Sequence, residues 1–319
     1  MPPRKSRSKI DIVIPVYNEE GVIERTHASL SAVINSLPYS FGVFYVDDGS
    51  TDATADALAA LARTDSRITL LEFSTNFGHQ AALTAGLDAS RGDFVISMDA
   101  DGQHPPEIIP EMIRLFEQGY DVVQAQRMDG EEEGASFKRI TSSAFYHFIN
   151  RISGTQMIPG AADFRGLSRQ AVDALKSMPE YHRFLRGMVS WIGYKSVILP
   201  YRESKRVGGR SKYNLGRMMR LAMDAIFSFS LVPLYIGLST GVGFMVLAAI
   251  QIASVVVLWM TNQKDQIVPG WSSLMALQLI GNGIIMILLG FIGVYLGYVF
   301  QEVKRRPIYL LKKGEHESE

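Results

Sequence analysis

The sequence predicts an α/β domain with a mostly parallel sheet, followed by a helix at a membrane surface and two membrane-spanning helices. Over the first two thirds of the chain, short apolar runs alternate with helical patterns, which is typical of a parallel sheet covered by helices. Two runs without a charged residue then follow, at 231–260 and 271–300. Each run is longer than the ~20 residues that cross a bilayer.

The elements of the first domain follow from the spacing of apolar residues. Short β-branched runs predict strands, and apolar residues recurring every three or four positions predict helices. The predicted strands are 10–16, 41–46, 68–73, 94–98, 121–126 and 196–201, and 162–177 predicts a short strand followed by a helix. The other predicted helices are 20–36, 52–62, 81–89, 106–119 and 137–152.

The charges beside the two apolar runs predict their orientation. Basic residues gather before the first run and after the second, whereas the segment between them contains only Lys264. The positive-inside rule then places both termini in the cytoplasm. The predicted segments are a cytoplasmic α/β domain (1–213), an interfacial amphipathic helix (214–230), a first span (231–260), an external loop (261–270), a second span (271–300) and a cytoplasmic tail (301–319).

Composition excludes several classes of protein. The chain has 319 residues, a formal net charge of zero and no cysteine. Balanced charge gives no electrostatic reason to expect nucleic acid as a partner. Without cysteine there is neither a disulfide framework nor a thiolate metal site. The N-terminal segment is basic but lacks the apolar stretch of a signal peptide.

Acidic residues follow two of the predicted strands. Asp99 and Asp101 come directly after 94–98, and alternate positions on an extended chain point to the same side. Two carboxylates so placed, without a histidine or cysteine partner, favour Mg²⁺ or Mn²⁺ with oxygen ligands and suit a nucleotide diphosphate. Asp48 follows the strand 41–46, and ligands bind beyond the carboxyl ends of parallel strands.

Four motifs in order carry a family resemblance. VIPVYNEE, VDDGSTDAT, MDADGQHPPE and GGRSKY, followed by two spans, resemble the family-2 glycosyltransferases that act on polyprenyl phosphates. The pattern is most like the bacterial undecaprenyl-phosphate glucosyl- and aminoarabinosyltransferases, and dolichyl-phosphate mannose synthase is more distant. The resemblance implies a GT-A fold, a location in the inner or plasma membrane, and inverting, metal-dependent transfer of one sugar. The implied donor is a nucleotide sugar, with UDP-glucose favoured, and the implied acceptor is undecaprenyl phosphate.

The resemblance also assigns site residues. The nucleotide pocket is expected to include Pro15, Tyr17, Glu19, Val46 and Asp48. The metal and diphosphate are expected to lie at Asp99, Ala100 and Asp101, with Gln103 beside them. The basic positions near the donor and acceptor phosphates are matched by Arg127, Arg206 and Lys212.

The acceptor is expected to need positive charge more than a strong base, because a phosphate monoester has a second pKa near ~6. We hypothesise that the residues attracting it are Arg127, Lys138 or Arg139, Arg206, Arg210 and Lys212. Asp163, in AADFRG, lies where related sugar transferases keep a catalytic acid, and it could be a base or could orient the acceptor. For Arg217 and Arg220, attraction to membrane lipid headgroups is the favoured interpretation.

Several alternatives stay open at this point. The donor could instead be UDP-aminoarabinose, a UDP-N-acetylhexosamine or GDP-mannose, and the chain could be a non-catalytic membrane scaffold. A processive polysaccharide synthase is disfavoured because the chain lacks a Q-x-x-R-W motif and further spans. His104 is expected to support the metal turn rather than bind the ion, and His79 and Gln80 to cover the donor or to begin a helix. The glycine pairs Gly237 with Gly241 and Gly293 with Gly297 could pair the two spans or join protomers of a homo-oligomer.

Overall fold

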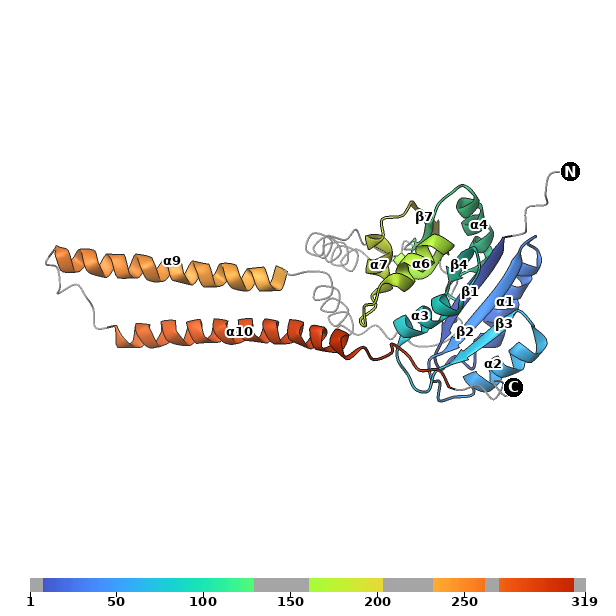
Figure 1. The fold of residues 1–319 in the computed structure, drawn as a ribbon, viewed down its shortest axis with the longest axis horizontal. Helices are drawn as coiled ribbons and strands as arrows, with labels where there is room; N and C mark the ends of the chain where they lie inside the picture. Colours follow the sequence, from blue (N-terminus) through green and yellow to red (C-terminus); the bar gives the residue numbers. More distant parts are fainter. Residues whose placement is uncertain (1–7, 129–160, 203–231, 262–269, 313–319) are drawn as a thin grey trace, which may run out of the picture. The chain divides into compact units, whose positions relative to one another are not determined.

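The computed structural model describes residues 8–128, 161–202, 232–261 and 270–312, and the chain divides into two compact units. The first unit contains the sheet and also the chain from Arg306 onward. The second contains two long helices (Figure 1). The predicted helix at 137–152, the interfacial helix at 214–230 and most of the loop at 261–270 lie outside the described residues.

The first unit is built on a seven-stranded sheet with the order β3-β2-β1-β4-β6-β5-β7. The strands are β1 (Lys9–Val16), β2 (Ser40–Asp47), β3 (Ile68–Glu72), β4 (Phe94–Ser97), β5 (Val122–Arg127), β6 (Ala161–Ser168) and β7 (Ser196–Tyr201). The helices are α1 (Ile23–Asn35), α2 (Thr54–Thr64), α3 (His79–Ala89), the short 3-10 helix η1 (Pro106–Ile108), α4 (Ile109–Glu117), α6 (Arg169–Ser177) and α7 (Leu185–Trp191). Each predicted strand within the described residues is therefore confirmed to within a few residues, whereas α7 was not predicted.

The sheet is mostly parallel, as predicted, with one exception. The strands β1 to β4 pair in parallel, and so do β5 and β7. Strand β6 lies between β4 and β5 and runs antiparallel to both. In the β4–β6 register Ser97 is opposite Arg165. The beginning of β6 therefore lies at the same sheet edge as the carboxyl end of β4.

The central strands of this unit are buried on both faces and form its core. In β1, Ile12 and Ile14 point to one face of the sheet and Val13 to the other, and all three are 0% exposed, as expected for a parallel strand covered on both faces. Helix α3 packs closely on this strand because Gly86 has no side chain: a Cβ there would overlap Cγ1 of Val13. Gly86 thus determines how near α3 lies to the sheet.

We expect Gly86→Ala to lower the free energy of unfolding by about 1–3 kcal/mol, because the added methyl group overpacks the interface of α3 and β1. Thermal unfolding of the purified protein in detergent measures this. The matched control is Gly21→Ala, since no described atom lies within 4 Å of a Cβ at Gly21. An equal melting temperature for the two variants would contradict the packing argument.

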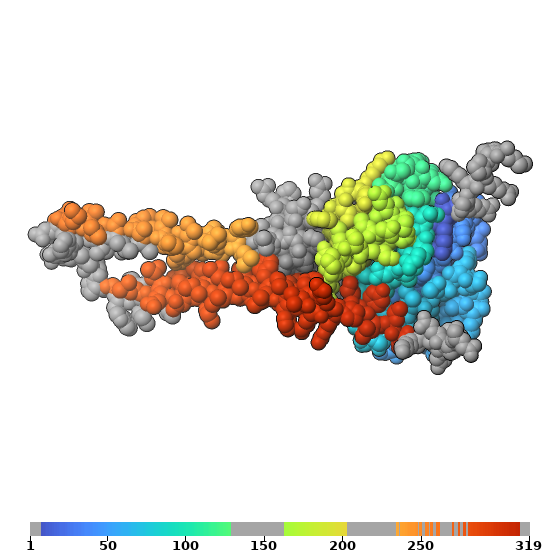
Figure 2. Space-filling view, viewed as in Figure 1, coloured from blue at the N-terminus to red at the C-terminus, as the bar shows by residue number. Residues whose placement is uncertain are grey.

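The second unit contains α9 (Val232–Met260) and α10 (Trp271–Lys304). Figure 2 shows α9 in orange and α10 in red, and their large apolar side chains are exposed, for example Met245 (74%) and Met286 (70%). Among the described residues one helix, Ile280–Lys304, is long and apolar enough to cross a membrane, and Gly237–Leu247 is a shorter apolar stretch. The predicted pair of spans is therefore matched by one candidate, and the other stays a prediction.

Of the glycine pairs, one member makes a contact between the two helices. A Cβ at Gly237 would overlap Leu288 of α10, so this glycine permits close packing within one chain. At Gly241, Gly293 and Gly297 no described atom lies within 4 Å of where a Cβ would be. The packing of α9 on α10 thus uses Gly237, and the association of protomers stays a prediction.

Candidate active site

The carboxyl ends of β1 and β2 meet, as the sequence predicts. The Asp48 N–H donates to the Val16 carbonyl at 2.9 Å, and the Asn18 N–H donates to Ser50 Oγ at 3.0 Å. The Glu19 N–H donates to Thr54 Oγ1 at 2.9 Å. These bonds join the two loops that leave neighbouring strands. Of the residues predicted to line the nucleotide pocket, Pro15 and Val46 are buried within strands and Tyr17 is 41% exposed.

Asp48 holds the loop 74–78, which joins β3 to α3. Its carboxylate accepts hydrogen bonds from the N–H groups of Phe77 (2.7 Å) and Gly78 (2.9 Å) and from Asn76 Nδ2 (3.0 Å). Burial raises the pKa of the Asp48 carboxyl, although the Phe77 and Gly78 N–H groups act in the opposite direction. Gly78 has a φ of 99° and precedes α3, so this bond network also places the start of that helix.

Asp99 and Asp101 lie in a turn directly after β4, and three hydrogen bonds hold its backbone. The Asp99 N–H donates to His104 Nδ1 at 2.8 Å, and the Gln103 N–H donates to Asp101 Oδ1 at 3.0 Å. The Ala100 carbonyl accepts from Thr26 Oγ1 of α1 at 2.9 Å. The turn that carries the acidic pair is thus attached to α1 and to His104.

His104 supports this turn from within the protein. It is 5% exposed, and its ring stacks on Phe164 of β6 with 4.8 Å between ring centres. Because Nδ1 accepts the Asp99 N–H, the proton of the neutral ring is on Nε2, which lies 3.7 Å from Asp99 Oδ2. This geometry agrees with the supporting role expected from the sequence.

The acidic pair fits Mg²⁺ or Mn²⁺ in its chemistry. Asp99 Oδ1 accepts no hydrogen bond from the described residues, although it is buried. Within the same part of the chain no three His, Cys, Asp or Glu side chains gather into a ready-made metal site. Mg²⁺ is commonly held by one or two carboxylates with its other ligands supplied by water and substrate phosphate. Asp99 and Asp101 are the residues that would hold such an ion.

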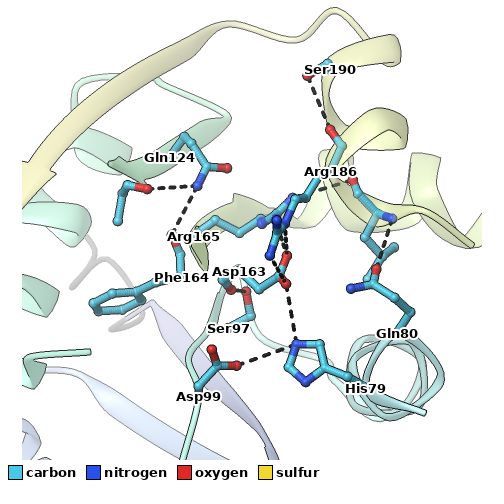
Figure 3. Close-up of polar contacts among 12 residues, drawn as sticks. His79, Gln80, Ser97, Asp99, Gln124, Asp163, Phe164, Arg165, Arg186 and Ser190 are labelled. Carbon is cyan, nitrogen blue, oxygen red and sulfur yellow. Dashed lines mark hydrogen bonds and ion pairs between the residues drawn. The ribbon is translucent and has the colours of Figure 1, made fainter. Parts of the chain in front are cut away.

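Asp163 lies near Asp99 because β6 is antiparallel to β4. Its carbonyl accepts a hydrogen bond from Ser97 Oγ at 2.7 Å. The buried carboxylate pairs with Arg165 Nη2 at 2.6 Å and with Arg186 Nη2, on α7, at 2.8 Å. His79, the first residue of α3, lies between the two aspartates: its Nε2 is 3.4 Å from Asp163 Oδ2 and 3.5 Å from Asp99 Oδ1 (Figure 3).

The charges of this cluster determine how Asp163 ionises. Burial alone would raise the pKa of the Asp163 carboxyl, but Arg186, His79 and Arg165 outweigh it and hold that pKa well below the usual range. Burial likewise lowers the pKa of His79, but Asp163 and Asp99 outweigh it and the net shift is upward. Asp163 is therefore a carboxylate engaged by two guanidinium groups, and a carboxylate with a depressed pKa is a weak proton acceptor.

The sequence analysis missed Arg165 and Arg186. Arg165 had a usable signal, since it stands two residues after Asp163 in a predicted strand and so shares its side. Arg186 had none, because α7 was not predicted and the contact joins residues 163 and 186 through the tertiary fold. Gln80 was singled out, and its Oε1 accepts the Leu185 N–H at 3.1 Å, which fastens α3 to the start of α7.

The predicted basic residues are only partly within the described chain. Arg127 is the last residue of β5, is exposed, and lies opposite Tyr201 of β7. The remaining candidates lie outside the described residues: Lys138, Arg139, Arg206, Arg210 and Lys212.

The chain belongs to glycosyltransferase family 2: residues 11–175 match the family described as "Glycosyl transferase family 2". It is therefore a glycosyltransferase.

Its relatives match almost over the full length. An uncharacterized glycosyltransferase, YkcC, of Bacillus subtilis (strain 168) is 38% identical, over 95% of this chain and 93% of the relative. The SfII prophage-derived bactoprenol glucosyl transferase of Shigella flexneri is 37% identical, over 96% of this chain and 98% of the relative.

Two solved structures are similar in fold. Mannosyl-3-phosphoglycerate synthase from Rubrobacter xylanophilus superposes with a TM-score of 0.50 at 16% identity, covering 69% of this chain and 72% of the other. Glucosyl-3-phosphoglycerate synthase from Mycobacterium tuberculosis, in complex with Mn²⁺, UDP and phosphoglyceric acid, has a TM-score of 0.50 at 20% identity, covering 69% and 78%. These likenesses support the GT-A sheet predicted from the sequence.

Proposed function

We propose that the protein transfers one glucose from UDP-glucose to undecaprenyl phosphate, yielding a lipid-phosphate-linked sugar for modification of cell-envelope glycans. The observation that carries the proposal is the near full-length similarity to a bactoprenol glucosyl transferase at 37% identity. The acidic turn after β4 and the apolar helix within α10 support it, because the reaction joins a nucleotide sugar to a lipid.

The proposed reaction is a single displacement. A phosphate oxygen of the lipid forms a bond to the anomeric carbon, and the bond from that carbon to the diphosphate oxygen breaks with its electron pair leaving on UDP. One displacement inverts the anomeric centre, so an α-linked donor yields a β-linked product. The attacking phosphate is mostly a dianion at neutral pH, with a second pKa near ~6, and needs no strong base.

The donor side of the site is proposed to be the edge formed by β1, β2 and β4. Pro15, Tyr17, Glu19 and Val46 would line the nucleotide pocket, and Asp48 would shape it through the loop 74–78 that it holds. Asp99 and Asp101 would hold Mg²⁺ or Mn²⁺, with Ala100 and Gln103 beside them. When bound, such an ion neutralises negative charge that develops on the diphosphate.

Asp163 is proposed to position other groups rather than to remove a proton. Its carboxylate already accepts hydrogen bonds from Arg165 Nη2 and from Arg186 Nε and Nη2. With its pKa held low, it orients these cations and His79 beside Asp99. The acceptor phosphate is proposed to be drawn by Arg127 and by the basic residues at 138, 139, 206, 210 and 212.

The proposed setting is the inner or plasma membrane, crossed twice, with the sheet unit and both termini on the cytoplasmic side. The apolar stretch in α10 supports attachment to the membrane, and the basic residues beside both runs support this orientation. We also propose that the protein forms a homo-oligomer.

The test is direct transfer. Purified full-length protein is incubated with undecaprenyl phosphate and a panel of radiolabelled nucleotide sugars, with Mg²⁺, with Mn²⁺ or with EDTA, and lipid-extracted label is counted. We expect label from UDP-glucose with either ion and none with EDTA. If only UDP-aminoarabinose, a UDP-N-acetylhexosamine or GDP-mannose gave labelled lipid, the sugar of that donor would replace glucose in the proposal. No transfer from any donor would contradict the proposed function and favour a scaffold.

A further inference from the structure

The chain just after α10 pairs with the outer side of the sheet, at the end of strand β3. Leu311 forms an antiparallel bridge with Phe73, directly after β3. The Ser74 N–H donates to the Leu310 carbonyl at 2.9 Å, and the Lys312 N–H donates to the Glu72 carbonyl at 2.8 Å. We call Ile308–Lys312 the C-terminal segment. It covers β3, which is one of the two end strands of the sheet, and so supplies partners to backbone groups that an edge strand leaves open.

Two side chains of the C-terminal segment pack on Phe73, just before the loop 74–78, and on α3. Tyr309 stacks on the fully buried Phe73 with 5.2 Å between ring centres and 10° between ring planes. Ile308 and Tyr309 also pack against a buried cluster formed by Val46, Phe73, Ala81, Ala82 and Ala85. The Tyr309 hydroxyl donates to Asp88 Oδ2, near the end of α3, at 3.1 Å. Burial and the neighbouring Asp88 raise the pKa of Tyr309 to about 12, so the hydroxyl keeps its proton.

Further contacts connect the C-terminal segment to the candidate active site. Phe73 meets Phe77 edge-on at 5.6 Å, and the N–H groups of Phe77 and Gly78 are donors to Asp48. Gly78 precedes α3, whose first residue, His79, contacts Asp99 and Asp163. The C-terminal segment therefore supports both ends of α3 and the loop that Asp48 holds.

We propose that the C-terminal segment is a positioning element for the nucleotide-sugar donor: by packing on Phe73 and on α3, it holds α3 and the adjoining loop 74–78 in the geometry that binds the nucleotide. Three residues, 305–307, lie between the end of α10 at Lys304 and Ile308. The same short segment thus links the apolar helix to the donor side of the site. The inference rests on the proposed function, which it deepens.

The experiment uses full-length protein in detergent and two substitutions of one residue. Tyr309→Ala removes the stacking and the bond to Asp88, whereas Tyr309→Phe keeps the ring and removes only the hydroxyl. The matched control is Leu310→Ala, because the Leu310 side chain is 52% exposed and its carbonyl bond to Ser74 is kept. The measurements are the KM for donor and for acceptor, the Kd of UDP with Mn²⁺, and hydrogen exchange at the Phe77 and Gly78 amides.

We expect Tyr309→Ala to raise the donor KM and the UDP Kd about three- to tenfold, as loss of an aromatic pair implies, with the acceptor KM unchanged. Exchange at Phe77 and Gly78 should become faster, because these amides would be less protected by a loosened loop. Tyr309→Phe should recover most of the donor affinity, and Leu310→Ala should match the unmodified protein.

Two results would overturn the inference. One is equal donor KM and UDP Kd in Tyr309→Ala and Leu310→Ala. The other is faster exchange with unchanged UDP affinity, which would leave the segment a purely structural cover of β3. If no nucleotide sugar supports transfer but UDP affinity and exchange change as expected, the proposed function fails while the positioning role of the segment stands.

Discussion

Asp163→Asn is expected to lower the free energy of unfolding by about 3–5 kcal/mol, because it removes the anion from a buried cluster that keeps its cations. Arg165 is 3% exposed and makes a 2.6 Å pair with this carboxylate, so its guanidinium would be left buried without a full counter-charge. Thermal unfolding in detergent, together with turnover below the melting temperature, measures the effect.

The control for this substitution is Asp173→Asn, which breaks a pair with Arg169 at the surface. The Asp173 side chain is 59% exposed, and surface ion pairs contribute about 0–1 kcal/mol to the free energy of unfolding. The melting temperature of the Asp173→Asn variant should therefore hardly change. The positioning role would be contradicted if Asp163→Asn kept full stability and lost turnover in a way that higher pH restored, since that behaviour belongs to a base.

Asp99→Asn is expected to lower kcat/KM about 10³-fold, as the loss of several kcal/mol of metal-derived stabilisation implies. The backbone bond from the Asp99 N–H to His104 is kept, so the turn should retain its shape. Transfer of labelled sugar measures the activity, and the melting temperature should change little.

Asp93→Asn is the matched control for this second substitution. Asp93 lies just before β4, whereas Asp99 lies just after it. Asp93 is exposed, and its carboxylate accepts the Lys9 N–H at the other end of the strands. The activity of the Asp93→Asn variant should stay within about twofold of that of the unmodified protein, because surface changes distant from a site have small effects. An Asp99→Asn variant that kept both its turnover and its sensitivity to EDTA would place the metal elsewhere.

Local patterns were sufficient to predict most of the sheet. The β-branched run at 10–16 became β1 because its residues are buried on both faces, and burial of that kind is visible in the residues themselves. Asp99 and Asp101 could be predicted to lie at the carboxyl edge, because a strand and its last residue are adjacent in sequence. The meeting of the β1 and β2 loops followed from the same rule.

The charge cluster could not be predicted in the same way. It depends on β6 running antiparallel to β4, which pairs Ser97 with Arg165 across many residues of intervening chain. No local pattern carries the direction of a strand, so the sequence alone leaves the distance from Asp163 to Asp99 undetermined. The packing of Tyr309 on Phe73 is similar, because a segment predicted to be a cytoplasmic tail gave no reason to place it beside a sheet.

The C-terminal segment is the last part of the described chain to be synthesised, and this has a consequence for biogenesis. Domains generally fold from the N-terminal side during translation, so β3 is made long before the residues that pair beside it. Until both apolar helices have left the ribosome, β3 and Phe73 lack their contacts with Ile308–Lys312. Completion of the sheet thus follows the synthesis of both apolar helices, which ties maturation of the proposed donor side to a late stage of translation.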